Sequence, residues 1–214
     1  MRPCERLVES CRDDWEAVTG HAFLQALAAG RLPRGKMAWY LAQGQACTDA
    51  FVRLLAAAAA HAPDLAGSLR AARILAQMEA AGQRLCRSSA GLCGRAAETG
   101  PCGTGAALLG LAGQSGCYAQ MLAALLAADW SLASWAAAQD AARTGAPDWA
   151  AGWIGHYGDP RLGEALRAFC GELDALWPGL DAAAQGAAAE MFRLVQAHGR
   201  ALLDAAWAID MAAG

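Results

Sequence analysis

The 214-residue sequence lacks the features that would tie it to a nucleic acid or a membrane. Charged residues make up only 17% of it, both signs are mixed along the chain, and the formal net charge is −3. Proteins that bind nucleic acid or an anionic membrane by electrostatic attraction normally carry a basic excess, which is missing here. The longest apolar run, residues 54–60, is far too short to cross a bilayer. We therefore expect neither nucleic acid nor a membrane as a partner.

Signals for export and for metal binding are also missing. No basic stretch is followed by an apolar run of signal-peptide length, so we expect a cytoplasmic protein. The 8 cysteines are scattered without a Cys-x-x-Cys pair, and a chain of this length can form a core without disulfides, so reduced thiols are expected. Cys86, Cys93 and Cys102 are neighbours in sequence, but their spacing matches no common zinc pattern and no histidine lies close behind them. The sequence therefore predicts no metal and no cofactor.

Helix-forming residues, by contrast, are abundant. Alanine is the commonest residue and the best helix former, and no window alternates apolar and polar residues over strand length. Apolar residues recur at helical spacing in several stretches, among them Leu7, Cys11, Trp15 and Val18; Leu65, Leu69, Ala72, Leu75 and Met78; and Leu162, Leu166, Phe169, Leu173 and Leu176. Glycine and proline separate about eight helices, with a long one from Pro33 towards Ala60 and the longest loop over residues 87–103. These patterns predict an all-α protein with a single domain over residues 1–214.

Several short stretches share a recognisable pattern. They are His21-Ala-Phe23-Leu24, Gly30-x-Leu32-Pro33, Tyr40-Leu41-Ala-Gln43 and Phe51-x-Arg53, followed by Leu125-Leu126 with Trp130, by Trp153-Ile154-Gly-His-Tyr157 and, more loosely, by residues 202–207. Together they resemble the TenA (thiaminase II) family over about residues 15–210. The resemblance implies a heme-oxygenase-like, all-helical fold and hydrolysis of thiamine or its aminopyrimidine fragments. It also implies assembly as a homodimer or homotetramer.

The residues that the resemblance implies for catalysis are not present. The Asp expected after Gln43 is replaced by Gly44, the nucleophilic Cys by Ala128, a pocket Tyr by Gly105, and a C-terminal catalytic Glu by Gly199. A nucleophile needs a thiol or hydroxyl, and a general acid needs a proton within reach. Alanine and glycine supply neither, so the usual Cys-dependent hydrolysis is not supported at these positions.

Glycine and alanine at all these positions predict an enlarged and less polar pocket, suited to a ligand bulkier than a pyrimidine. The resemblance adds Trp130, Trp153 and Tyr157 to this pocket, and Cys47 shares the helix face of Gly44. The expected pocket residues are Gly44, Cys47, Gly105, Ala128, Trp130, Trp153, Tyr157 and Gly199.

We interpret Cys47 as a buried thiol without an activating base nearby, and we expect Asp129 to face solvent. His21 is expected to order a helix start; it is the nearest available heme ligand, but nothing else supports heme.

Three functions remain open on this sequence. The first is binding or transformation of a small molecule in a rebuilt pocket. The second is an active thiamine or aminopyrimidine hydrolase that uses other residues, with Cys47 as the nucleophile. The third is a non-catalytic regulatory or interaction protein on the same scaffold. A large void beside Gly44, Gly105 and Ala128 would favour the first, Cys47 close to an acid the second, and a filled centre the third.

Overall fold

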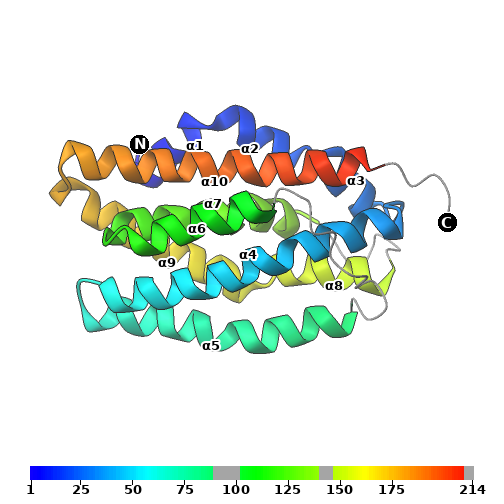
Figure 1. Cartoon of the computed structure of the whole chain (residues 1–214), viewed down its shortest axis with the longest axis horizontal. Coiled ribbons are helices and arrows are strands. Elements are labelled where there is room, and N and C mark those ends of the chain that lie inside the picture. The colour runs from blue at the N-terminus through cyan, green and yellow to red at the C-terminus, as the bar shows by residue number, and fades with distance from the viewer. Residues whose placement is uncertain (89–101, 140–146, 210–214) are drawn as a thin grey trace.

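A computed structural model describes the backbone of residues 1–88, 102–139 and 147–209, and the side chains there except those of residues 45, 46, 77–88 and 102. Helices are the only regular structure in these ranges, so the all-α prediction is confirmed. They are α1 (Pro3–Ser10), α2 (Arg12–Thr19), α3 (Ala22–Ala28), α4 (Arg34–His61), α5 (Leu65–Ser88), α6 (Cys102–Gln114), α7 (Tyr118–Ala137), α8 (Asp148–Tyr157), α9 (Pro160–Leu176), the 3₁₀ turn η1 (Trp177–Gly179) and α10 (Ala182–Ala208). Figure 1 shows that the long helices α4, α5 and α10 run along the long axis of the molecule. No helix in the described ranges is both long and apolar enough to span a bilayer.

Several helix starts follow directly from the local sequence. Pro33 precedes the first residue of α4, where a fixed φ suits the entry into a helix. Asp159 and Asp181 cap α9 and α10, because their carboxylates accept hydrogen bonds from backbone N–H groups of the first turn. Between α6 and α7 the chain turns at Gly116, whose φ of 69° is the left-handed conformation that glycine tolerates best.

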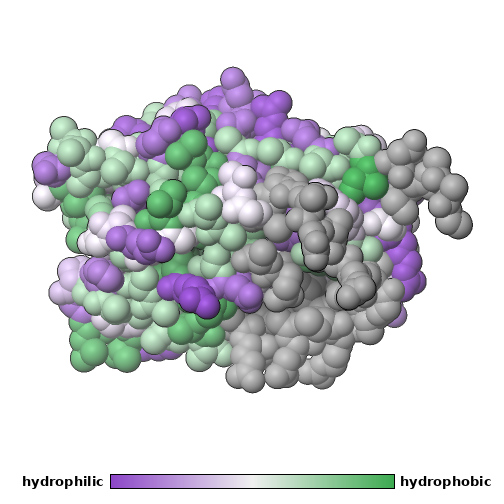
Figure 2. Space-filling view, viewed as in Figure 1, coloured by the Kyte–Doolittle hydropathy of each residue, from purple (hydrophilic) through white to green (hydrophobic). Residues whose placement is uncertain are grey.

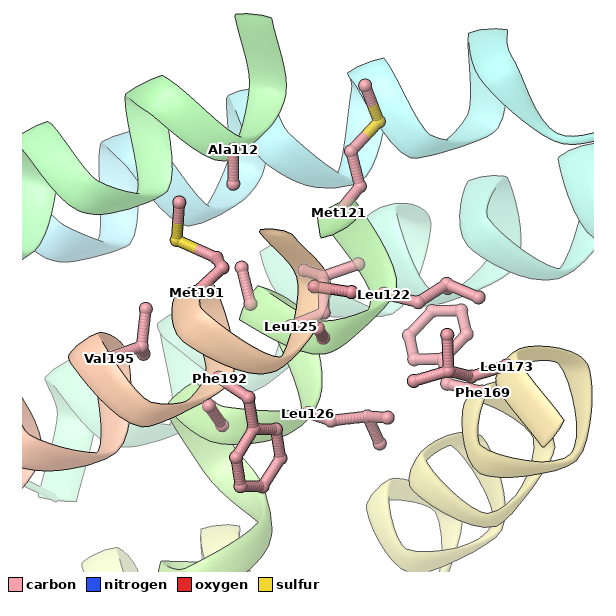
Figure 3. Packing of buried hydrophobic residues seen from close by; sticks show 14 of the residues in the cluster. Ala112, Met121, Leu122, Leu125, Leu126, Phe169, Leu173, Met191, Phe192 and Val195 are labelled. Carbon is pink, nitrogen blue, oxygen red and sulfur yellow. The ribbon is translucent and has the colours of Figure 1, made fainter. Parts of the chain in front are cut away.

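Helix α7 lies at the centre of the protein. It is apolar all round, and most of its residues are buried, as expected of a helix enclosed on every side. Figure 3 shows Leu122 and Leu126 of α7 pointing towards α9, and Phe192 of α10 beside them. These contacts belong to the larger of two apolar clusters, which includes residues of α1, α4, α6, α7, α9 and α10.

The smaller cluster joins the N-terminal region to the ends of the central helices. Phe23 and Leu24 of α3 are fully buried in it, together with Trp153 of α8 and Leu203 of α10. The α8 segment is thereby fixed against α3 and the C-terminal part of α10. Residues of both clusters line the cavity described below.

The apolar run at residues 54–60 is mostly core. Leu54, Leu55 and Ala58 are buried, which leaves only alanines of this run exposed. The apolar stripe at the start of α5 behaves differently, because Leu65 and Leu69 are exposed.

Among the described cysteines no disulfide forms. The predicted loop at 87–103 lies largely outside the described residues, as do Cys93 and the side chains of Cys86 and Cys102.

Candidate functional site

A cavity of about 390 Å³ borders on both apolar clusters. Residues of α2 and of every helix from α4 to α10 contribute to its wall, and they come from both clusters. The volume falls within the range of about 300–1,000 Å³ that is typical of small-molecule sites. Most of the lining side chains are apolar, so the cavity can hold a ligand with a substantial apolar body.

The helices bring together the positions where the resemblance implies catalytic residues. Gly44 of α4, Gly105 of α6, Ala128 of α7 and Gly199 of α10 all line the cavity. A Cβ atom added at Gly44 or Gly199 would meet no atom within 4 Å. The missing side chains at these two positions therefore leave open space in the cavity.

Gly105 has different surroundings. A Cβ atom there would lie 2.3 Å from Nε2 of His198 and 2.9 Å from Sγ of Cys47. The sulfur and the imidazole nitrogen therefore lie no farther apart than the sum of these distances, about 5.2 Å. Gly105 is needed so that the two side chains can occupy this space. His198 is thus a basic group near Cys47, which the sequence interpretation did not anticipate.

Asp129 also faces the cavity, which corrects the expectation that it faces solvent. Burial raises the pKa of its carboxyl from an ordinary value of 3.8 to about 7. Within the described part of the chain, no side chain forms an ion pair or a hydrogen bond with it. The expectation was wrong because position 129 lies on the part of α7 that lines the cavity, next to Ala127 and Ala128.

Two polar side chains of α10 add unused hydrogen-bonding groups. Gln196 is 1% exposed, and neither its amide nitrogen nor its amide oxygen has a partner among the described residues. His198 Nε2 is likewise buried without a partner there, and burial lowers the pKa of this imidazole. Buried polar groups normally find a partner, so these atoms are available to a ligand or to water. The sequence signal for Gln196 was its helical spacing, because Gly199 follows three residues later on the same helix face.

Aromatic rings form one part of the cavity wall. Tyr40, Trp153 and Tyr157 all line it. The ring centroids of Tyr40 and Trp153 are 5.9 Å apart, and those of Trp153 and Tyr157 are 4.6 Å apart. Burial is the main cause that raises the pKa of both phenols, and the nearby charge of Asp129 raises them further. Asp129 and both tyrosines line the same cavity.

Other predicted residues lie elsewhere. Trp130 is not in the cavity lining; it packs edge-on against Trp15, with ring centroids 5.5 Å apart. His21 is also outside the lining and caps α3, where its Nδ1 accepts a hydrogen bond from the Phe23 N–H. Its Nε2 lies 3.1 Å from Oδ1 of Asp204. His21 therefore has the structural role that was expected of a residue at the helix start.

The described residues contain no group of three or more His, Cys, Asp or Glu side chains that could hold a metal ion. The chemistry available in the cavity is thus that of individual groups. They are a carboxyl, a thiol near an imidazole, a second imidazole, an amide, two phenols and two aliphatic hydroxyls, set in an apolar wall.

Comparison with solved structures supports the fold. A TenA homologue from Pyrococcus furiosus superposes with a TM-score of 0.78 at 16% identity, over 95% of this chain and 99% of that one. A TenA family transcription regulator from Silicibacter sp. TM1040 gives 0.81 at 22% identity, over 97% of both chains. A candidate TenA-like thiaminase from Sulfolobus solfataricus gives 0.74 at 16% identity, over 95% of both. No curated protein matches the sequence.

The sequence itself matches a family profile in its N-terminal part. Residues 9–89 match the profile of the TENA/THI-4/PQQC family. This region contains α3 and α4, and with them Gly44 and Cys47 of the cavity wall. The rest of the chain continues the same fold as the solved TenA homologues. The N-terminal sequence is thus similar to the TENA/THI-4/PQQC family, and the chain as a whole shares the fold of the solved TenA homologues.

Proposed function

We propose that this protein binds or transforms a small molecule in the central cavity, without the Cys-dependent hydrolysis of thiamine or aminopyrimidines. The observation that carries the proposal is the open cavity of about 390 Å³ with Ala128 in its wall, where the resemblance implies a nucleophilic Cys. The open space at Gly44 and Gly199 supports an enlarged pocket. A purely surface-acting protein would be expected to have a filled centre, so the cavity argues for a ligand. The described cysteines are free thiols, which fits the reducing cytoplasm as the site of action.

The absence of the usual hydrolysis is tested with the purified protein. Thiamine and aminopyrimidine hydrolysis should stay far below about 1 s⁻¹, the low end of ordinary enzyme rates, because neither Ala128 nor Gly199 supplies a reacting group. The assay needs a denatured sample as the control. Turnover near 1 s⁻¹ that disappears on denaturation would contradict the proposal.

The presence of a ligand is tested by native mass spectrometry of protein purified without added ligand. We expect a bound compound that is absent from the Gly44→Leu variant, because the new side chain fills open cavity space. Gly186→Leu is the matched control, since Gly186 lies on α10, is exposed and does not line the cavity. Bare protein in all samples, together with no small-molecule binding in a broad thermal-shift screen, would count against a ligand-binding function.

A second candidate function is hydrolysis with Cys47 as the nucleophile. It is favoured by one observation, the closeness of the Cys47 sulfur to Nε2 of His198. A neutral imidazole can accept the proton of a thiol and so generate the reactive thiolate. If thiamine or aminopyrimidine turnover is found, both Cys47→Ala and His198→Ala should abolish it under this hypothesis. Loss in neither variant would exclude the pair.

A further inference from the structure

The most unusual group in the cavity is the carboxyl of Asp129. A buried ionised carboxylate is costly unless a cation or several hydrogen-bond donors compensate its charge. The described residues provide neither, and no Lys or Arg occurs among the cavity-lining residues that the structure describes. When ionised, this carboxyl therefore lacks a compensating partner among the described residues, and a ligand in the cavity can reach it.

The rings beside Asp129 restrict what that ligand can be. Tyr40, Trp153 and Tyr157 line the cavity together with Asp129, and successive ring centroids are 5.9 and 4.6 Å apart. Aromatic faces attract cations, and clusters of such rings are typical of sites that bind organic ammonium groups. The carboxylate and the rings line one cavity, and both favour positive charge in it.

The rest of the cavity wall indicates what kind of molecule carries the positive charge. Leu109, Leu125, Leu166 and Phe169 contribute apolar surface to the wall. A bare metal ion would not use this surface, and hard cations such as Mg²⁺ or Ca²⁺ need several oxygen ligands, whereas Asp129 is the one carboxylate in the described lining. The volume of about 390 Å³ suits an organic molecule instead.

We propose that the cavity binds an organic cation, an alkyl- or aryl-substituted ammonium compound whose charged nitrogen lies between Asp129 and the Tyr40, Trp153 and Tyr157 rings. The apolar body of the ligand extends along the leucine-rich wall. Gln196, with an unpartnered donor and acceptor, is available for a polar substituent on that body. This inference rests on the proposed small-molecule function and names the chemical class of the ligand.

The test compares a cation with an uncharged compound of the same shape. Benzyltrimethylammonium and its carbon isostere neopentylbenzene are titrated into the protein, with intrinsic tryptophan fluorescence or calorimetry as the readout. At pH 8 we expect the ammonium compound to bind at least tenfold more tightly than the isostere. Equal affinity, or no binding of the ammonium compound up to 10 mM, would overturn the proposal.

Two variants test whether Asp129 causes the preference for the ammonium compound over the uncharged isostere. In Asp129→Asn, ammonium affinity should fall at least tenfold, while affinity for the isostere stays within twofold. Asp13→Asn is the matched control, because Asp13 is exposed and is not among the residues that line the cavity. An unchanged preference for the cation in Asp129→Asn would overturn the proposal.

The rings give a second, independent test that does not depend on Asp129→Asn folding. Tyr157→Leu removes the ring and should weaken ammonium binding about fivefold, as expected for loss of a cation–π contact. Tyr157→Phe keeps the ring and should bind within twofold of the original protein. Equal losses in both variants would show that the hydroxyl, and not the ring, contacts the ligand, and would overturn the aromatic part of the site.

Failure of this inference can be told apart from failure of the proposed function. If both probes fail but native mass spectrometry shows a neutral or anionic compound that Gly44→Leu excludes, the ligand class is wrong and the binding function stands. If no compound is retained and no probe binds, both proposals fail.

Discussion

Gly44 and Gly105 both line the cavity, but a methyl group at each would meet different surroundings. Gly44 has no atom within 4 Å of an added Cβ, whereas Gly105 has His198 Nε2 at 2.3 Å. Both lie in helices, where replacing Gly by Ala stabilises by about 0.5–1 kcal/mol if there is room. We expect Gly44→Ala to raise the free energy of unfolding by this amount and Gly105→Ala to lower it, because His198 must move. Urea denaturation of both variants checks this, and equal stabilisation by both would contradict the structure.

Asp129 gives a prediction about stability and pH. Its pKa is about 7 in the folded protein against an ordinary value of 3.8. Between pH 4 and 7 the folded state therefore keeps a proton that the unfolded chain has lost, so Asp129 makes stability fall as pH rises through this window. Asp129→Asn removes the titrating group. We expect it to be as stable as the original protein at pH 4 and more stable by roughly 1–4 kcal/mol at pH 8.

Thermal or urea denaturation of both proteins from pH 4 to 8 measures this difference. Other titratable groups at the cavity are Tyr40, Cys47, His156, Tyr157 and His198. His198 has the opposite effect on stability. Burial lowers its pKa, so the unfolded chain takes up a proton before the folded protein does as pH falls, and stability falls with it. These groups are common to both proteins, so their contributions largely cancel in the difference. A difference that does not change with pH would show that Asp129 does not titrate in this range.

Single residues were the hardest feature to predict from sequence. Gly44 and Ala128 could be assigned to one pocket because motif residues flank them, while Gly105 and Gly199 were assigned by the resemblance with less local support. All four line the cavity. The role of Asp129 could not be found in this way, because a lone charged residue next to an alanine gives no sign of which way it points. That depends on tertiary packing around α7, which local sequence does not encode.

At the scale of elements, a partly buried polar contact joins helices α5, α7 and α9. Glu172 of α9 forms an ion pair with Arg70 of α5, and it accepts a hydrogen bond from the Tyr118 hydroxyl at the start of α7. The Glu172 side chain is only 14% exposed. Removing one partner from such a contact leaves the others without compensation, and this costs more than the contact itself contributes.

We therefore expect Glu172→Ala to lower the free energy of unfolding by about 1–3 kcal/mol. Glu190→Ala is the matched control, because Glu190 pairs with Arg193 on the exposed surface of α10, where solvent screens the pair and it contributes little. Chemical denaturation of both variants gives the comparison. Equal losses would mean that the Glu172 contact is screened as strongly as a surface pair.

The elements themselves were well predicted where the chain has clear start and stop signals. The long helix after Pro33 is observed as α4, and the breaks at residues 113–116 and 177–179 separate α6 from α7 and α9 from α10. Periodicity alone did not say which face is buried. In α5 the stripe of Leu65, Leu69 and Ala72 is exposed, while the neighbouring Ala71 is buried. A stripe of apolar residues shows that a face is apolar, but not what covers it.

At the scale of the whole molecule, this exposed stripe concerns self-association. An apolar run such as 54–60 needs burial in the core or against a second subunit, and the structure buries Leu54, Leu55 and Ala58 in the core. Leu65 and Leu69 remain, 73% and 46% exposed and one helical turn apart on α5. Figure 2 shows hydrophobic surface at the end of the molecule where α4 meets α5. Exposed apolar surface of this kind is typical of interaction sites.

We still expect at least a homodimer, since symmetric self-association is the commonest way for a protein to cover such a surface. Light scattering at micromolar concentration should give at least twice the 22.1 kDa monomer mass. A Leu65→Glu, Leu69→Glu double variant should then shift the mass to that of the monomer, because each subunit would place buried carboxylates in the interface. Leu111→Glu is the control, a 60% exposed leucine on α6. Dissociation by Leu111→Glu alone would place the interface on α6, and a monomer mass for the unaltered protein would refute self-association.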